Sequence, residues 1–185
     1  MPVTPALRTA EEAARRLLVL AAVSGVAAGL DRETILDWLR QEALWSAASP
    51  AEQRFLADAH PSERDTIHFS WQMEAVYALG WALRLIPAMD PPAEQASIGG
   101  ILEQVPGPGD PAAGFVASCA LRPAAEIHRA TEAALDAHAR CRAARRRGEP
   151  ERNGYDIEVA QERHRALNWL TRYGDADWDD VATDT

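Results

Sequence analysis

Two charged residues stand on apolar helix faces and are the first candidates for chemistry in this sequence. Apolar residues lie three, four and seven positions from Glu74, so a helix there places its carboxylate among apolar side chains. Arg163 stands on a similar stripe in a second helical stretch, beside residues such as Val159 and Leu167. Because a charge buried alone is costly and these two are opposite, we predict that Glu74 and Arg163 meet, directly or through one bridging residue.

Two interpretations of these charges stay open. In the favoured one, they form a structural network that fixes the register of the helices, because such networks are also found in proteins without catalytic activity. In the other, they line a pre-organised charged cleft. The residues assigned to the structural network are Arg16, Glu74, Arg163 and Asp184.

Two histidines each have a polar residue one helical turn further along the chain. His164 precedes Asn168 by four positions, and His138 precedes Arg142 by four. Such pairs can orient a ligand or transfer a proton, but hydrogen bonds to neighbouring structure, such as the acidic tail, are the favoured explanation. The full set of ligand-binding candidates is Glu74, His138, Arg142, Arg163, His164 and Asn168.

No metal site, catalytic residue or cofactor is predicted. Residues 175–179 carry aspartates with the spacing that begins a calcium loop, but Asp180 replaces the glycine that the turn needs, and no bidentate glutamate follows. Neither of the 2 cysteines belongs to a CxxC pair. Serine-hydrolase elbows, HExxH zinc motifs and nucleotide-binding glycine patterns are missing as well, so an enzyme is the less favoured class.

The overall charge argues against nucleic acid and membranes as partners. The formal net charge is -9, whereas phosphate neutralisation needs a basic face. An arginine run from Arg140 to Arg147 has no interleaved aromatic residues and reads as the solvated end of a helix. The absence of a cysteine framework favours a reducing compartment, so we expect a cytoplasmic protein.

The first apolar run resembles part of an export signal. Arg15 and Arg16 precede the stretch Leu17–Leu30, as a basic region precedes an apolar one. Glu11 and Glu12 do not fit such a signal, and the stretch is shorter than the roughly 20 residues that a spanning helix needs. We therefore expect a buried first helix.

Apolar residues recur at offsets of three and four almost everywhere, which predicts an all-α fold. We expect a single-domain array of helices over residues 1–185, in which a proline- and glycine-rich segment, 87–114, is mobile because it holds six of the 12 prolines. The acidic tail should pack on the body through Trp178 and Val181. The predicted helices cover residues 9–28, 31–45, 50–59, 62–85, 123–147 and 156–174, with at most a short helix at 94–103.

Several segments also resemble one protein family. The specific part is the end motif, Glu162–Leu170 followed by Trp178-Asp179-Asp180-Val181 and Thr183-Asp184-Thr185, which is similar to the C-terminal signature of the uncharacterised, mostly bacterial family catalogued as domain of unknown function 4272. The resemblance covers about residues 10–185 and implies boundaries and a bacterial setting, but no activity. One departure is Ala139, where the family pattern has a tryptophan. The other matching positions are Asp37-Trp38-Leu39, Ser49-Pro50 with Glu52, Trp71, Glu74, Trp81-Ala82-Leu83, Leu121-Arg122-Pro123, Glu126-Ile127, His138 and Arg142.

The sequence thus favours a non-enzymatic cytoplasmic binding or protein-interaction module whose acidic surface meets a protein partner. The alternative is an enzyme or small-ligand-binding protein that uses the polar candidates given above. A ligand site requires those groups to converge on a pocket, whereas a structural network requires them to bond one another. The sequence leaves the oligomeric state open.

Overall fold

Helices make up all the regular structure in the part of the chain that the computed structural model describes, residues 6–185. This confirms the all-α, single-domain prediction; residues 1–5 of the predicted domain lie outside the described residues. The α-helices are α1 (Ala10–Ala27), α2 (Arg32–Gln41), α3 (Pro50–Ala57), α4 (Glu63–Ser70), α5 (Met73–Ala82), α6 (Gly99–Leu102), α7 (Ala113–Ser118), α8 (Ala124–Arg147) and α9 (Ile157–Leu170). Short 3-10 turns are η1 (Trp45–Ala47), η2 (Tyr173–Asp175) and η3 (Trp178–Asp180).

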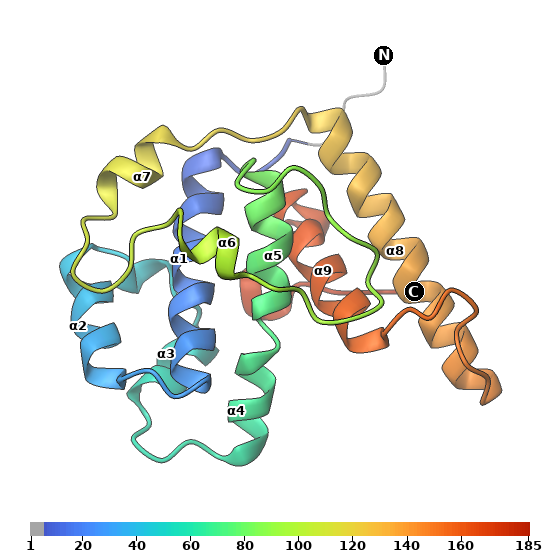
Figure 1. The fold of residues 1–185 in the computed structure, drawn as a ribbon, viewed down its shortest axis with the longest axis horizontal. Coiled ribbons are helices and arrows are strands. Elements are labelled where there is room, and N and C mark those ends of the chain that lie inside the picture. Colours follow the sequence, from blue (N-terminus) through green and yellow to red (C-terminus); the bar gives the residue numbers. More distant parts are fainter. Residues whose placement is uncertain (1–5) are drawn as a thin grey trace.

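Helix α1 is the buried first helix that its sequence predicts. A capping box between Thr9 and Glu12 begins it, and the following turns are buried on nearly all sides. It packs against α4, α5 and α7, while α9 packs between α5 and α8. Figure 1 shows α1, α5 and α9 in the middle of the molecule, with α8 on one flank and α2 and α3 on the other.

The predicted helix over 62–85 is wrong as a single element, because the structure divides it into α4 and α5. At the break the Ser70 hydroxyl donates to the carbonyl of Ile67 at 2.7 Å, while the Trp71 amide reaches the same carbonyl only at 3.4 Å. A serine hydroxyl that competes for a helical carbonyl is a known cause of bending. Ser70 and Met73, on either side of the break, line a pocket described below.

The second helix is also shorter than predicted. It ends at Gln41, and Ala43 adopts a positive φ of 54°, so Trp45 belongs to the turn η1. The short helix expected within 94–103 is α6, which is confined to four residues, and α7 is a further short helix that was not predicted. Helix α6 lies against α5 where Gly80 leaves room, since a Cβ there would stand 2.6 Å from Ile101 Cδ1.

The segment 87–114 is tied to the body at several points. The Asp156 amide donates to the Pro92 carbonyl at 2.7 Å, and the Trp38 indole N–H donates to the Asp110 carbonyl at 2.9 Å. Ile101 is buried. These contacts attach the segment to the surrounding helices. Its mobility was not tested by them and stays a prediction.

The acidic tail packs on the body, as predicted. Trp178 and Val181 are buried, and Trp169 meets the Trp178 ring edge-on with 5.7 Å between centroids. The Ala51 amide donates to Asp179 Oδ2 at 2.9 Å, which joins the tail to the first turn of α3. Over residues 6–185, no helix is both long and apolar enough to cross a membrane.

Candidate functional site

Glu74 on α5 and Arg163 on α9 form a buried ion pair. Arg163 Nε donates to Glu74 Oε2 at 2.9 Å, and the two side chains are 0% and 4% exposed. The contact joins α5 to α9, two helices that pack along each other. The direct meeting that helical geometry predicts is therefore present in the structure.

The remaining polar atoms of this pair hold the segment that follows α5. The Ala96 amide donates to Glu74 Oε1 at 2.7 Å, and Arg163 Nη1 donates to the Asp90 carbonyl at 2.6 Å. The Arg163 guanidinium also lies over the Tyr77 ring, 4.7 Å from its centroid. Both charges are thus bonded to each other and to the backbone, as a buried pair requires.

His138 on α8 and His164 on α9 face each other in the core. Their Nδ1 atoms are 3.2 Å apart, so one imidazole donates and the other accepts, and each side chain is 1% exposed. Burial lowers the pKa of His164 to about 4, with His138 adding to the effect and Asp184 opposing it. Burial, then the charge of Arg142, also lowers the pKa of His138. Both rings are neutral near pH 7, which suits a structural contact between α8 and α9.

The other polar candidates do not converge with these. Asn168 Nδ2 donates to the Ala182 carbonyl at 2.9 Å and so holds the tail. Arg142 and Asp184 are exposed, and Asp184 acts on His164 only through its charge. Arg163 lines two pockets beside the segment 89–97, whereas its partner Glu74 lines neither of them. The contacts favour a structural role for this set.

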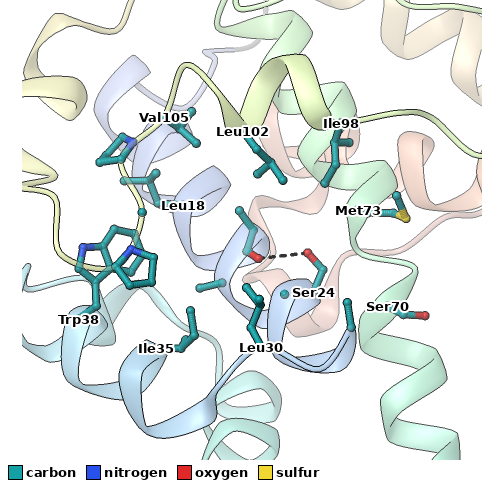
Figure 2. Close-up of a pocket in the computed structure, with 17 residues that line it drawn as sticks. Leu18, Ser24, Leu30, Ile35, Trp38, Ser70, Met73, Ile98, Leu102 and Val105 are labelled. Carbon is teal, nitrogen blue, oxygen red and sulfur yellow. Dashed lines mark hydrogen bonds between the residues drawn. The ribbon is translucent and has the colours of Figure 1, made fainter.

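A pocket that the sequence does not reveal lies on another part of the molecule (Figure 2). It has a volume of about 420 Å³, within the usual range for small-molecule sites. Its walls come from α1, the start of α2, the break between α4 and α5, and the segment around α6, as Figure 2 shows for Leu18, Ile35, Met73 and Leu102. The lining residues are Leu18, Ala21, Ala22, Ser24, Gly25, Ala28, Leu30, Ile35, Trp38, Ser70, Met73, Ile98, Leu102, Val105, Pro106, Gly107 and Pro108.

The polar side chains of this apolar pocket are already bonded to the protein. Ser24 Oγ donates to the Leu20 carbonyl at 2.7 Å, and Ser70 Oγ donates to Ile67 at 2.7 Å. The Trp38 indole N–H donates to Asp110. The lining includes no acid, base or thiol. The pocket therefore offers apolar surface and no free side-chain N–H or O–H group.

Exposed leucines stand at the rim of this pocket. Leu30 is 57% exposed and Leu102 is 44% exposed, although both are large apolar side chains. The sequence signal available was the apolar character of Ile98, Leu102 and Val105 within a segment rich in proline and glycine. Which helices those residues meet depends on the tertiary fold.

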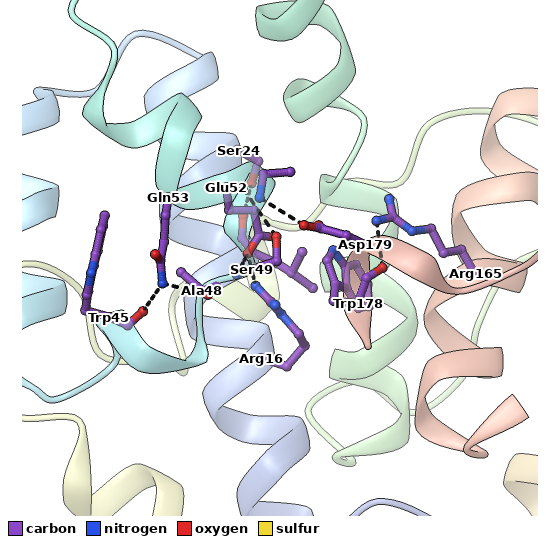
Figure 3. A network of polar contacts seen from close by, with 12 residues as sticks. Arg16, Ser24, Trp45, Ala48, Ser49, Glu52, Gln53, Arg165, Trp178 and Asp179 are labelled. Atoms are coloured by element: carbon purple, nitrogen blue, oxygen red, sulfur yellow. Dashed lines mark hydrogen bonds and ion pairs between the residues drawn. The ribbon is translucent and has the colours of Figure 1, made fainter. Parts of the chain in front are cut away.

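Arg16 pairs with Glu52 and not with Glu74, which corrects the predicted single network (Figure 3). Glu52 is the capping-box glutamate of α3, and its Oε2 accepts from Arg16 Nη2 and from the Ser49 amide. Burial lowers the pKa of Arg16, with Glu52 opposing that effect. The charges thus form two separate buried pairs, because α3 packs on α1 and places Glu52 next to Arg16.

Trp178 of the tail lies next to the Arg16–Glu52 pair. The guanidinium carbons of Arg16 and Arg165 are 4.9 and 4.7 Å from its ring centroid. Arg165 Nη2 also donates to the Trp178 carbonyl at 3.1 Å. Figure 3 shows how these groups link α1, α3, α9 and the tail.

Metal ligands do not gather anywhere in residues 6–185: the structure brings no group of three or more His, Cys, Asp and Glu side chains together to hold an ion. In particular, Asp179 of the calcium-like spacing is bonded to the Ala51 amide.

Comparison with known proteins gives one match. The family model described as Domain of unknown function (DUF4272) matches residues 2–181, nearly the whole chain. The resemblance carried by the end motif is thereby confirmed. No curated protein and no solved structure matches the chain.

Proposed function

This chain belongs to the DUF4272 family, and from its geometry we propose that it is a non-enzymatic binding protein that takes a small apolar molecule into the pocket between α1, α2 and α6. The observation that carries the proposal is the lining of that pocket. Its serines and its tryptophan donate their O–H and N–H groups to main-chain carbonyls, so these groups are not available to bind a polar ligand. An uncharged, hydrocarbon-rich molecule suits such a lining best.

A peptide is a poorer occupant for the same reason. An extended or helical peptide brings backbone amides and carbonyls, or its own charged side chains, and these need partners when they leave water. The lining side chains supply no free N–H or O–H donor for the peptide carbonyls and no charged partner for its side chains. A small molecule without polar groups in its buried part has no such requirement.

The pocket also supports binding in preference to catalysis. General acid–base chemistry needs a titratable group within reach of the substrate, and nucleophilic chemistry needs an activated hydroxyl or thiol. The two serine hydroxyls at the pocket donate to carbonyls of their own helices, and the lining has no base to activate them. The buried charged residues Glu74 and Arg163 lie outside this lining.

The setting that we propose is the cytoplasm of a bacterium, with the acidic surface free to meet a protein partner. The net charge of -9 supports a protein that avoids nucleic acid and anionic lipid. Ligand occupancy of the apolar pocket would then alter the surface formed by Leu30 and Leu102 at its rim.

The test is a titration with N-phenyl-1-naphthylamine, an uncharged aromatic probe whose fluorescence rises in apolar surroundings. We expect saturable binding at one site per chain. Leu102→Glu places a carboxylate at the rim and should weaken binding by at least about tenfold, because the probe loses apolar contact and meets a charge that resists burial.

Leu135→Glu is the matched control. Leu135 is 41% exposed, close to the 44% of Leu102, but it lies on α8 and does not line the pocket. We expect this variant to bind the probe as the parent protein does, and both variants to retain the helical circular dichroism spectrum. Non-saturable binding, or equal loss of binding in the two variants, would count against the proposal.

A further inference from the structure

Three polar atoms around Trp178 lack a hydrogen-bond partner in the described part of the chain. They are Arg16 Nε, Glu52 Oε1 and Trp178 Nε1. Their side chains are all buried, and the Arg16 guanidinium lies over the Trp178 ring. Buried polar atoms are rarely left unbonded in native proteins, so the two N–H groups call for an acceptor, and Glu52 Oε1 for a donor, from outside residues 6–185.

A second pocket lies beside these atoms. It has a volume of about 480 Å³ and is formed by the first half of α1, the turn before α3, and the tail. Arg16 and Trp178, which carry the two unbonded N–H groups, are among its lining residues, and it shares no lining residue with the apolar pocket. The lining consists of Arg8, Glu12, Arg15, Arg16, Ser46, Ala47, Ala48, Ser49, Pro50, Trp169, Asp177, Trp178, Asp179 and Asp180.

The charges of this polar pocket have both signs. Some are already engaged: Arg8 donates to the carbonyls of Trp169 and Ala176, and Asp179 accepts from the Ala51 amide. Asp177 and Asp180 are exposed carboxylates at the same pocket and belong to none of the ion pairs found among residues 6–185. The two residues with unbonded N–H groups therefore line the same pocket as two carboxylates without an ion-pair partner.

From this arrangement we propose that the polar pocket binds a small zwitterion of the α-amino acid class. The ligand carboxylate accepts from the N–H groups of Arg16 and Trp178, and its ammonium group faces Asp177 and Asp180. A simple anion would meet these carboxylates, and a simple cation would leave the N–H groups unbonded. Because both N–H groups are covered in the free protein, the η3 turn that carries Trp178 shifts slightly on binding.

The first experiment compares ligands on the intact protein. Each common α-amino acid is screened by thermal shift at millimolar concentration, and the best is titrated by calorimetry beside its N-acetyl and methyl ester derivatives. The N-acetyl derivative lacks the positive charge and the ester lacks the negative charge. We expect at least about tenfold weaker binding of both derivatives; equal binding of either derivative, or no binding by any amino acid, would overturn the proposal.

Two sets of variants locate the site. Trp178→Phe removes the N–H and keeps an aromatic ring, and the Asp177→Asn, Asp180→Asn double variant removes the exposed charges; each should weaken binding by about tenfold. Asp184→Asn, an exposed tail residue outside the pocket lining, is the control and should bind as the parent does.

The affinity of Trp178→Phe for the amino acid separates a ligand from an ordered water. Trp178 is buried and two guanidinium groups lie over its ring, so the smaller phenylalanine should lower the melting temperature of the free protein whether or not Nε1 has a partner. A Trp178→Phe protein that binds the amino acid as the parent does would mean that Nε1 does not serve the ligand, and the proposal would fall. Binding to the apolar pocket uses other residues, so the Leu102→Glu result is independent of this outcome.

Discussion

The buried pair of Glu74 and Arg163 gives the sharpest stability prediction. Arg163→Met leaves a carboxylate that is 0% exposed with one remaining bond, from the Ala96 amide, so the free energy of unfolding should fall by about 3 to 5 kcal/mol. Glu74→Gln keeps an acceptor for that amide but leaves the Arg163 guanidinium with only Asp90 and Tyr77, and should cost an amount at the lower end of the same range, about 3 kcal/mol.

The double variant should cost clearly less than the two single variants together. In the double variant the Arg163 guanidinium is absent, so Glu74→Gln leaves no buried charge without a partner. We therefore expect a coupling free energy of about 2 to 3 kcal/mol. The assay is urea unfolding of the parent, both single variants and the double variant, followed by circular dichroism, with the denaturant slope compared among all of them.

An exposed pair provides the control for this cycle. Arg15 and Glu11 are 3.2 Å apart on the surface of α1, so the same treatment, Arg15→Met with Glu11→Gln, should give a coupling below about 0.5 kcal/mol. If the Glu74 and Arg163 effects add to within about 0.5 kcal/mol, the pair does not hold α5 to α9 and the reasoning from its geometry is refuted.

Three further outcomes are expected from the same structure. The folded-state pKa of His164, about 4, lies below the unfolded value near 6.5, so the unfolded chain takes up the proton first. The free energy of unfolding should therefore fall as the pH drops from about 6.5 to 4, by at most about 3 kcal/mol. A His164→Gln variant should lose part of this pH dependence in urea unfolding, and an unchanged pH profile would contradict the prediction. Deleting residues 177–185 removes the buried Trp178 and should lower the melting temperature, whereas a truncated protein that melts with the parent would show that the tail adds no stability. Amide hydrogen exchange should be faster over 87–114 than in α5 and α9, and equal protection would show that the segment is as stable as the core.

The sequence was sufficient to predict the parts of the fold that depend on local signals. The buried α1 and the long α8 both follow from residue types at fixed offsets. The contact of Glu74 with Arg163 was also predictable, because two opposite charges on apolar stripes have few other solutions. The break at Ser70 was not, since it contains neither proline nor glycine and depends on a hydroxyl that bonds to the backbone.

The partners of Arg16 show where local signals stop. Glu52 caps the first turn of α3, and the same carboxylate also neutralises Arg16 because α3 packs on α1, a contact that was not predicted. The apolar pocket was missed for a related reason: its residues come from segments far apart in the chain, each of which reads as ordinary core or loop. A pocket forms where side chains from such segments leave space between them, and the spacing of apolar residues along the chain does not predict where this happens.

The binding role assigned to the apolar pocket is tested most directly by methionine methyl NMR. The chain has only 3 methionines, Met1, Met73 and Met89, so a protein labelled with ¹³C at the methionine methyl groups gives a simple spectrum. Met73 lines the apolar pocket, and Met89 lines a different one. On titration with N-phenyl-1-naphthylamine, we expect a saturable shift of the Met73 methyl and cross-relaxation between it and the probe, with Met89 unchanged. Saturable binding that leaves Met73 unmoved, or that shifts Met89 equally, would contradict it.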